Sequence, residues 1–290
     1  MPPLFATRRR LLARILLYGG AVFVGLPLAA SQMLVGTIRQ PTLEPWKPWE
    51  GITVRSDGLR LRGWLARGTD ERAAVVVAHG LGDSLESYAD AGGVLHRRGH
   101  TVLLVDLRGH GGSEGRLTTL GGREREDVRA GMRALRERGL ASRGFVLLGV
   151  SMGAVAAIRA AAEEPDVRAV IAEAPYDDYR GTTLHHARLY YGLPSWFPLV
   201  PAAIKVAEWR AGFRADDVSA VEAARRFHGA LLVIADGEDE RMPEVVCRRV
   251  LDAHPGPRRF WIAPGAPHSG AGNAPGYWET VLGFLDEAGL

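Results

Sequence analysis

The chain has 290 residues, of which 47% are hydrophobic, so it is long enough to bury a large core. Its formal net charge of +3 is uneven, because residues 1–40 contain five arginines and no acidic residue. The remainder is therefore mildly acidic, which argues against a general phosphate-binding surface and a nucleic-acid partner. The single cysteine, Cys247, excludes an internal disulfide and a cysteine-based metal site.

Residues 15–38 form an apolar stretch without a charged side chain. As a helix, this stretch is long enough to cross the roughly 30 Å hydrocarbon core of a bilayer. Arg8–Arg10 precede it, so the positive-inside tendency predicts a cytoplasmic N-terminus and a body on the extracytoplasmic side. We therefore expect residues 1–40 to be a basic segment followed by an uncleaved, single-pass membrane anchor. The alternatives are a cleaved signal peptide, although residues 28–31 form a poor cleavage site, or a buried N-terminal helix.

Residues 41–50 are rich in proline and tryptophan and are expected to form a linker. Its tryptophans would lie either at the membrane interface or against the edge of a sheet. The folded domain is expected to cover residues 51–290. It opens with a hairpin pattern at 52–66, where Ser-Asp-Gly separates two strand-like runs.

Strand-like and helix-like patterns then alternate as far as the C-terminus. This alternation predicts an α/β fold with a mainly parallel sheet and helices on both of its faces. Between residues 175 and 227 the pattern becomes irregular, aromatic and broken by prolines, over a length too great for a plain loop. We therefore expect this stretch to be a small cap inserted over the active site. Buried strands are expected at 73–78, 101–105, 145–150, 167–172, 230–235 and 259–263.

The sequence Gly149-Val-Ser151-Met-Gly153 follows a run of apolar residues and precedes an alanine-rich segment. This pattern predicts a buried strand, a very tight turn and a helix packed closely on the sheet. The two glycines would remove Cβ atoms that collide in such a turn. Ser151 would then lie at a helix N-terminus, where the helix dipole favours an oxyanion.

Five motifs, in their order along the chain, resemble the α/β-hydrolase family over about residues 51–290. The resemblance is closest to small serine hydrolases of the monoacylglycerol-lipase-like and membrane-anchored Bem46-like groups. It implies an eight-stranded, mostly parallel sheet with a small helical cap. The motifs are His79-Gly-Leu-Gly82, Asp106-Leu-Arg-Gly-His-Gly-Gly-Ser113, Gly149-Val-Ser-Met-Gly153, Asp239 with Pro243, and Pro264-Gly-Ala-Pro-His268.

The same resemblance assigns roles to individual residues. Ser151 is the nucleophile, His268 is the general base and then the general acid, and Asp239 orients the imidazole of His268. The oxyanion hole would use the backbone N–H groups of Leu81 and Met152. These are the catalytic residues that we expect.

The choice of the acid rests on its position after the penultimate strand and four residues before a proline, which selects Asp239. The family usually has a glycine three residues before this acid, whereas Asp236 stands there and Gly237 follows. The loop is therefore shaped differently, and other acids remain open. They are Asp236, Glu238 and Glu240 nearby, with Glu173 or Asp177 after the preceding strand as a fallback.

Other conspicuous polar residues are expected to have structural roles. By the resemblance, His79 and the turn that begins at Asp106 belong to the scaffold. The glycines of that turn lack the Gly-Lys-Ser/Thr ending of a phosphate-binding loop. His185 and His186 fall in the cap, where we expect them to be exposed to solvent.

The sequence thus predicts a membrane-anchored serine hydrolase that cleaves esters or thioesters through an acyl-enzyme, with no metal and no cofactor. Its partners would be the membrane and a small or lipid-like ester. A peptidase or amidase with the same triad is the alternative, and a non-catalytic binding protein is a less favoured one. Some bulky cap residues are expected to line an acyl pocket, with Trp196 and Phe197 setting the preference for chain length. The bulky apolar side chains of the cap are Leu184, Tyr190, Tyr191, Trp196, Phe197, Leu199, Val200, Trp209 and Phe213.

Overall fold

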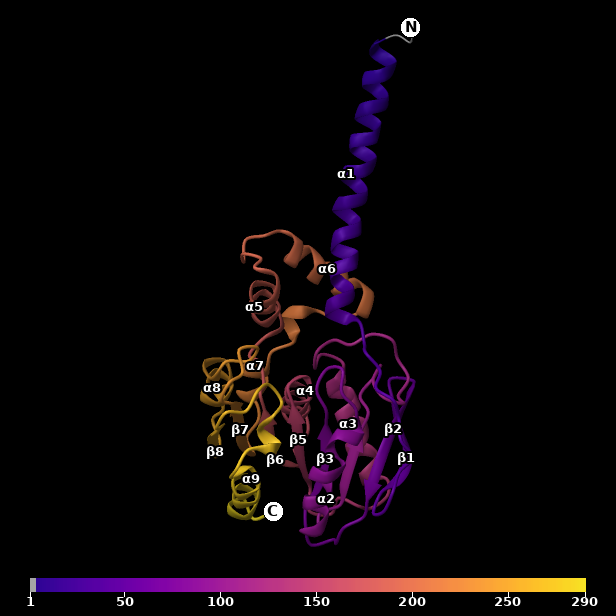
Figure 1. Cartoon of the computed structure of the whole chain (residues 1–290). Coiled ribbons are helices and arrows are strands. Elements are labelled where there is room, and N and C mark those ends of the chain that lie inside the picture. The colour runs from indigo at the N-terminus through magenta and orange to yellow at the C-terminus, as the bar shows by residue number, and fades with distance from the viewer. Residues whose placement is uncertain (1–3) are drawn as a thin grey trace.

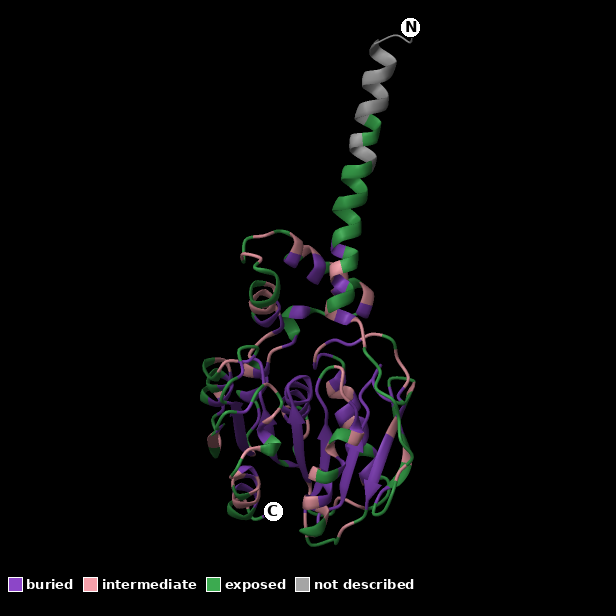
Figure 2. Ribbon diagram, in the orientation of Figure 1, coloured by how far each residue is buried: buried purple, intermediate pink, exposed green. Residues whose placement is uncertain are grey.

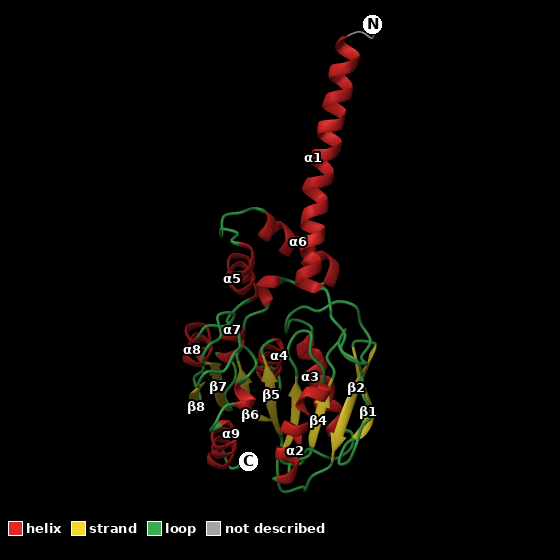
Figure 3. Cartoon of the chain, in the orientation of Figure 1, coloured by secondary structure: helices red, strands yellow, loops and turns green. Residues whose placement is uncertain are grey.

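The protein is described from a computed structural model, which covers residues 4–290, with side chains from residue 13 onward except at 15–17. One eight-stranded sheet runs through the body in the order β1-β2-β4-β3-β5-β6-β7-β8 (Figures 1 and 3). The strands are β1 (Glu50–Ser56), β2 (Leu59–Ala66), β3 (Ala74–Ala78), β4 (Val102–Val105), β5 (Phe145–Val150), β6 (Val167–Glu173), β7 (Ala230–Asp236) and β8 (Arg258–Ala263). The α-helices are α1 (Leu4–Val35), α2 (Ala89–Arg97), α3 (Glu124–Arg136), α4 (Met152–Ala161), α5 (Tyr179–Tyr191), α6 (Leu199–Ala211), α7 (Ala220–Ala224), α8 (Glu244–Ala253) and α9 (Tyr277–Glu287).

Strand β2 pairs antiparallel with β1 and with β4, and every other neighbouring pair of strands is parallel. Alternate residues of the central strands supply two separate cores. In β3, Val76 belongs to the core that side chains of α3, α4 and α8 share on one face, whereas Val75 and Val77 belong to the core that α2 and α9 share on the other. Figure 2 shows these strands as the buried centre of the body. The predicted α/β-hydrolase fold is confirmed.

The segment expected to be a cap contains α5 and α6, which stand above the carboxyl ends of the strands (Figure 1). A bridge between Asp178 and Ser219 joins the two ends of this excursion at its base. Helix α7 lies beyond the bridge, and its alanines pack in the core of the body beneath. The part that stands away from the sheet is therefore shorter than the predicted range of 175–227.

The tryptophans of the segment at 41–50 cover the sheet. Trp46 meets Trp64 of β2 edge to face, with 4.7 Å between the ring centroids, and the ring of Trp49 lies 6.4 Å from that of Trp64. Trp49 and Trp64 are both buried. Of the two positions considered for these tryptophans, the structure shows the one against the sheet.

Helix α1 rises from the body beside α6, and most of those of its residues whose burial is described, 13–14 and 18–35, are exposed (Figures 1 and 2). Within it, Tyr18–Val35 is long and apolar enough to cross a membrane, a property that a signal sequence near the N-terminus would share. The last turns of α1 belong to the folded body. Val35 is completely buried against α6, and the Arg210 guanidinium donates to Ser31 Oγ at 2.8 Å and to Gln32 Oε1 at 2.6 Å.

Candidate active site

Ser151 lies in the tight turn between β5 and α4, with a φ of 52°, a value that side-chain-bearing residues rarely adopt. The flanking glycines make this turn possible. A Cβ on Gly149 would lie 2.3 Å from the carbonyl oxygen of Gly153. A Cβ on Gly153 would lie 2.1 Å from the carbonyl oxygen of Ala78 in β3. Helix α4 can therefore approach the sheet closely enough to hold the Ser151 hydroxyl above the strand ends.

His268 and Asp239 reach Ser151 from two different loops. His268 lies between β8 and α9, and Asp239 lies between β7 and α8. His268 Nε2 is 3.0 Å from Ser151 Oγ, and His268 Nδ1 is 2.5 Å from Asp239 Oδ2. The structure thus brings together a hydroxyl, an imidazole and a carboxylate in an order that allows proton transfer from the serine.

Two backbone N–H groups hold the Asp239 carboxylate in addition to His268. Asp239 Oδ1 accepts hydrogen bonds from the backbone N–H groups of Arg241 at 2.8 Å and Met242 at 3.0 Å. Burial opposes ionisation of this carboxyl, but the hydrogen bond from His268 and these backbone donors outweigh it. The pKa of Asp239 therefore lies below its usual value, and the ionised carboxylate keeps the proton of His268 on Nδ1.

The rival acids occupy other places. Asp236 Oδ2 accepts from the backbone N–H of Ser269 at 2.6 Å, and Glu173 Oε1 accepts from that of Ala271 at 3.2 Å. These two buried side chains fix the backbone of the loop that carries His268, but neither is hydrogen-bonded to its imidazole. Burial raises the pKa of Asp236 to about 6 and that of Glu173 to about 8, where the Asp236 charge adds to the effect.

Asp236, Asp239 and His268 also place three potential metal-ligand atoms within 4.8 Å of one another. His268 Nδ1 and Asp239 Oδ2 already bind each other, and Asp236 Oδ2 accepts from the backbone of Ser269. A cation about 2.0–2.2 Å from both His268 Nδ1 and Asp239 Oδ2 would have to replace their 2.5 Å hydrogen bond. The cluster therefore suits the orientation of the imidazole better than it suits a metal ion.

Leu81 and Met152 both lie at the cavity that contains Ser151. Met152 is the first residue of α4, so its N–H has no acceptor within the helix. In the described part of the chain, the backbone N–H of Leu81 likewise has no backbone acceptor. Gly80, which precedes Leu81, lies close to the serine, since a Cβ added to Gly80 would be 3.7 Å from Ser151 Cβ. Two N–H groups are thus available beside the serine.

His79 and Asp106 support the loops around this site. His79 is completely buried, its Nε2 accepts from the N–H of Leu107 at 3.0 Å, and burial together with the nearby His110 lowers its pKa to about 4. Asp106 accepts from the backbone N–H groups of Leu85 at 2.8 Å and of Gly112 at 2.9 Å. His79 Nδ1 also lies 2.7 Å from the carbonyl oxygen of Gly80, so both ring nitrogens are engaged and the imidazole has a structural role, as the resemblance implied.

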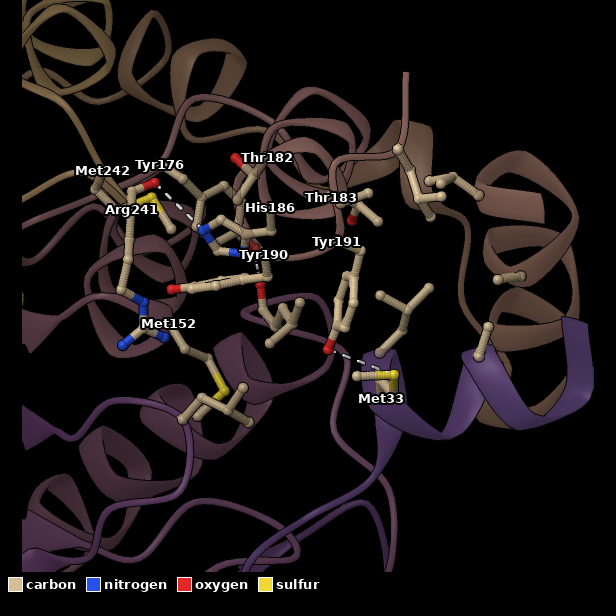
Figure 4. Close-up of a pocket in the computed structure, with 18 of the residues that line it drawn as sticks. Met33, Met152, Tyr176, Thr182, Thr183, His186, Tyr190, Tyr191, Arg241 and Met242 are labelled. Atoms are coloured by element: carbon tan, nitrogen blue, oxygen red, sulfur yellow. Dashed lines mark hydrogen bonds between the residues drawn. The ribbon is translucent and has the colours of Figure 1, made fainter. Parts of the chain in front are cut away.

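A cavity of about 500 Å³ has Ser151 in its wall, and most of its lining surface is apolar (Figure 4). Cap residues of α5 and α6 supply much of the lining, including Tyr190, Tyr191, Leu199 and Val200. These four belong to the cap side chains expected near an acyl pocket. Trp196 and Phe197 do not line the cavity, because they lie in the turn between α5 and α6, where Trp196 is 77% exposed.

Two features of the cavity were not anticipated from the sequence. The end of α1 contributes Ala30, Met33 and Leu34 to the wall. His186 also lines the cavity, and burial lowers its pKa to about 4. His185 Nε2 lies 2.8 Å from the carbonyl oxygen of Glu240, so both cap histidines are half-buried beside the Asp239 loop and the expectation of free exposure is wrong for them.

Comparison with known proteins supports this description. The model of the Hydrolase_4 family, described as serine aminopeptidase S33, matches residues 69–210. The uncharacterized protein YqkD of Bacillus subtilis is 29% identical over 234 residues, which cover 79% of this chain and 76% of YqkD.

Two solved structures share the fold. The Pyrococcus furiosus esterase Pf2001 superposes with a TM-score of 0.68 at 22% identity, covering 87% of this chain and 98% of the esterase. The Pyrococcus horikoshii acylaminoacyl peptidase superposes with a TM-score of 0.60 at 17% identity, covering 82% of this chain and 41% of the peptidase. The chain thus has the α/β-hydrolase fold, and the family model matched over residues 69–210 supports a hydrolase of the esterase- and peptidase-like kind.

Proposed function

We propose that the protein is a serine hydrolase that cleaves carboxylic esters or thioesters through an acyl-enzyme on Ser151. The observation that carries this proposal is the position of His268, whose Nε2 is 3.0 Å from Ser151 Oγ while its Nδ1 is 2.5 Å from Asp239. His268 takes the serine proton as Oγ attacks the acyl carbon, and it then protonates the departing alkoxide or thiolate. Water activated by the same imidazole attacks the acyl-enzyme and releases the acid.

The charge that develops on the substrate carbonyl oxygen needs donors aimed at it. In this proposal the backbone N–H groups of Leu81 and Met152 supply them, and the positive end of the α4 dipole adds to their effect. One group follows the buried Gly80, and the other lies at the first turn of the buried helix α4. The site would therefore need little rearrangement as the reaction proceeds.

The lining of the cavity favours apolar acyl esters over peptides with a free amino terminus. Among the described residues that line it there is no Asp or Glu, and the basic side chains there are those of Arg241 and the half-buried His186. An ammonium group in this cavity would lose water and gain no carboxylate partner, which is costly. A neutral acyl chain has no such cost.

Burying acyl carbons in this cavity contributes about 0.8 kcal/mol for each methylene removed from water. We therefore expect kcat/KM for p-nitrophenyl esters to rise at least about tenfold from acetyl to octanoyl and to level off when the cavity is full. Steady-state kinetics on a graded ester series, with aminoacyl p-nitroanilides alongside, measures this. A flat ester profile together with rapid turnover of the anilides would show instead that the enzyme is a peptidase.

The proposal includes the use of α1 as an uncleaved anchor that holds the body on the extracytoplasmic side. It is motivated by the arginines at 8–10 and by the apolar span that follows them. The test fuses to the C-terminus a reporter enzyme that is active only after export. We expect the fusion to be active and to remain in the membrane fraction. A soluble cytoplasmic fusion contradicts this topology, and a soluble exported fragment indicates a cleaved signal peptide.

A further inference from the structure

We propose that the last two turns of α1 form one wall of the acyl-binding site, so that the helix that anchors the protein also determines which acyl chains it accepts. This inference rests on the proposed hydrolase function and adds a specificity role for α1. Ala30, Met33 and Leu34 follow one another at helical spacing and share one face of the helix. All three line the same cavity as Ser151 and the cap residues of α5 and α6. Figure 4 shows Met33 beside Tyr191 of α5.

The wall is fixed to the body by the neighbouring face of the same helix. Pro27, Ser31 and Val35 form a buried stripe along α1. Val35 packs with Ala207 of α6, and its carbonyl oxygen accepts from the N–H of Thr118 at 2.9 Å. The cavity-lining face of α1 is therefore held in a defined position.

The chain immediately after α1 secures its end further. The Arg39 guanidinium donates to the carbonyl oxygens of Gly111 at 2.8 Å, Ser113 at 2.7 Å and Gly115 at 2.8 Å. Gly36 forms a bridge with Leu117. Gly36 and Arg39 belong to the segment of residues 1–40 that the sequence assigned to the anchor, so the end of that segment packs against the hydrolase body.

One mouth of the cavity lies between α1 and α5. Met33 and Tyr191 line the cavity and are nevertheless 61% and 57% exposed, so they stand at its edge. Tyr191 Oη donates to Met33 Sδ at 3.8 Å across this edge (Figure 4). An acyl chain that passes between these side chains would have its ester group near Ser151 and its far end against α1.

The surroundings of this mouth suit a lipid surface. Farther along α1, Val22, Phe23 and Leu26 are exposed apolar side chains. Trp196 and Trp209 of the cap are also about 80% exposed, and tryptophans at such positions favour the interface of a bilayer. We infer that the substrate is a single-chain acyl ester that partitions into the bilayer and enters along α1. A cavity of about 500 Å³ matches a ligand of that size.

The test uses full-length protein in detergent micelles and the ratio of kcat/KM for octanoyl and acetyl p-nitrophenyl esters. Ala30→Trp adds bulk inside the cavity, and we expect this ratio to fall at least tenfold. Met33→Ala enlarges the mouth, and we expect the longest well-accepted chain to lengthen by at least two carbons. Leu28→Trp is the control, because Leu28 lies on the same turns of α1, is exposed and does not line the cavity; it should leave the ratio unchanged.

The possible results separate the inference from the proposed function. If native protein hydrolyses none of these esters, the proposed function itself fails. If native protein is active but Ala30→Trp and Leu28→Trp have the same ratio as native protein, the α1 wall is wrong. Thermal unfolding of each variant shows whether it is folded. If Ala30→Trp misfolds, the chain-length preference of Met33→Ala still tests the α1 wall.

A separate experiment, which measures hydrolysis in vesicles, tests whether the substrate enters from the bilayer. In phosphatidylcholine vesicles that contain full-length protein and a long-chain monoacylglycerol, the rate should follow the mole fraction of substrate in the lipid. Diluting the substrate with added phosphatidylcholine at constant total substrate should therefore lower the rate. A rate that depends only on total substrate would overturn entry along α1.

Discussion

Asp239→Asn is expected to retain the fold and to lower kcat about 10⁴-fold. An amide cannot hold the proton of His268 on Nδ1 as an ionised carboxylate does, so the imidazole can take the tautomer whose Nε2 carries a proton. That tautomer cannot accept the Ser151 proton across the 3.0 Å contact. Measurement of kcat on an octanoyl ester, with far-ultraviolet circular dichroism to verify folding, tests this result.

The matched control is Asp236→Asn. Asp236 is buried and close by, but its Oδ2 accepts from the N–H of Ser269 rather than from the imidazole. An asparagine side-chain oxygen can still accept that hydrogen bond, so we expect a far smaller loss of kcat than for Asp239→Asn. If the two effects were reversed, Asp236 would be the acid that orients His268.

The second large effect concerns the close packing of α4 against the end of β3, next to Ser151. Gly153→Ala places a Cβ 2.1 Å from the carbonyl oxygen of Ala78 and 2.6 Å from that of His79, both of them backbone atoms. Helix α4 would have to move away from the end of β3, which we expect to cost about 3 kcal/mol in the free energy of unfolding. For a domain of this size the midpoint of thermal unfolding should fall by at least about 6 °C.

Gly283→Ala is the control for this substitution. Gly283 lies within α9, and an added Cβ there would meet only the end of the flexible Arg259 side chain, at 3.8 Å. Alanine is the better helix former, so this change should stabilise the protein by about 0.5–1 kcal/mol. Equal midpoints for the two variants would contradict a close approach of α4 to β3.

Much of the fold could be predicted because local sequence determines it. Continuous apolar runs such as that of β3 form strands buried on both faces, and the glycines at 149 and 153 permit the very tight turn around Ser151 that other residues would obstruct. The position of Asp239 was harder to predict. Asp236 replaces the usual glycine, and only the three-dimensional path of the loop shows which carboxylate meets His268.

The role of α1 could not be predicted for a different reason. An apolar side chain that faces lipid and one that faces a substrate cavity look the same in a sequence, so the sequence alone does not distinguish Phe23, which is exposed, from Met33, which lines the cavity. The same ambiguity affects the cap. Trp196 is as apolar as Tyr191, but the turn after α5 directs it away from the cavity. Which face a residue occupies depends on long-range packing.

The central claim, that Ser151 is the nucleophile, is tested most directly by a fluorophosphonate probe. Full-length protein is incubated with the probe and digested, and the modified peptide is identified by mass spectrometry. The account predicts a single phosphonyl adduct on Ser151, formed rapidly in native protein and at least about 10³-fold more slowly in Asp239→Asn, where His268 is no longer oriented. An adduct on another residue, or no adduct in folded, native protein, would contradict the account.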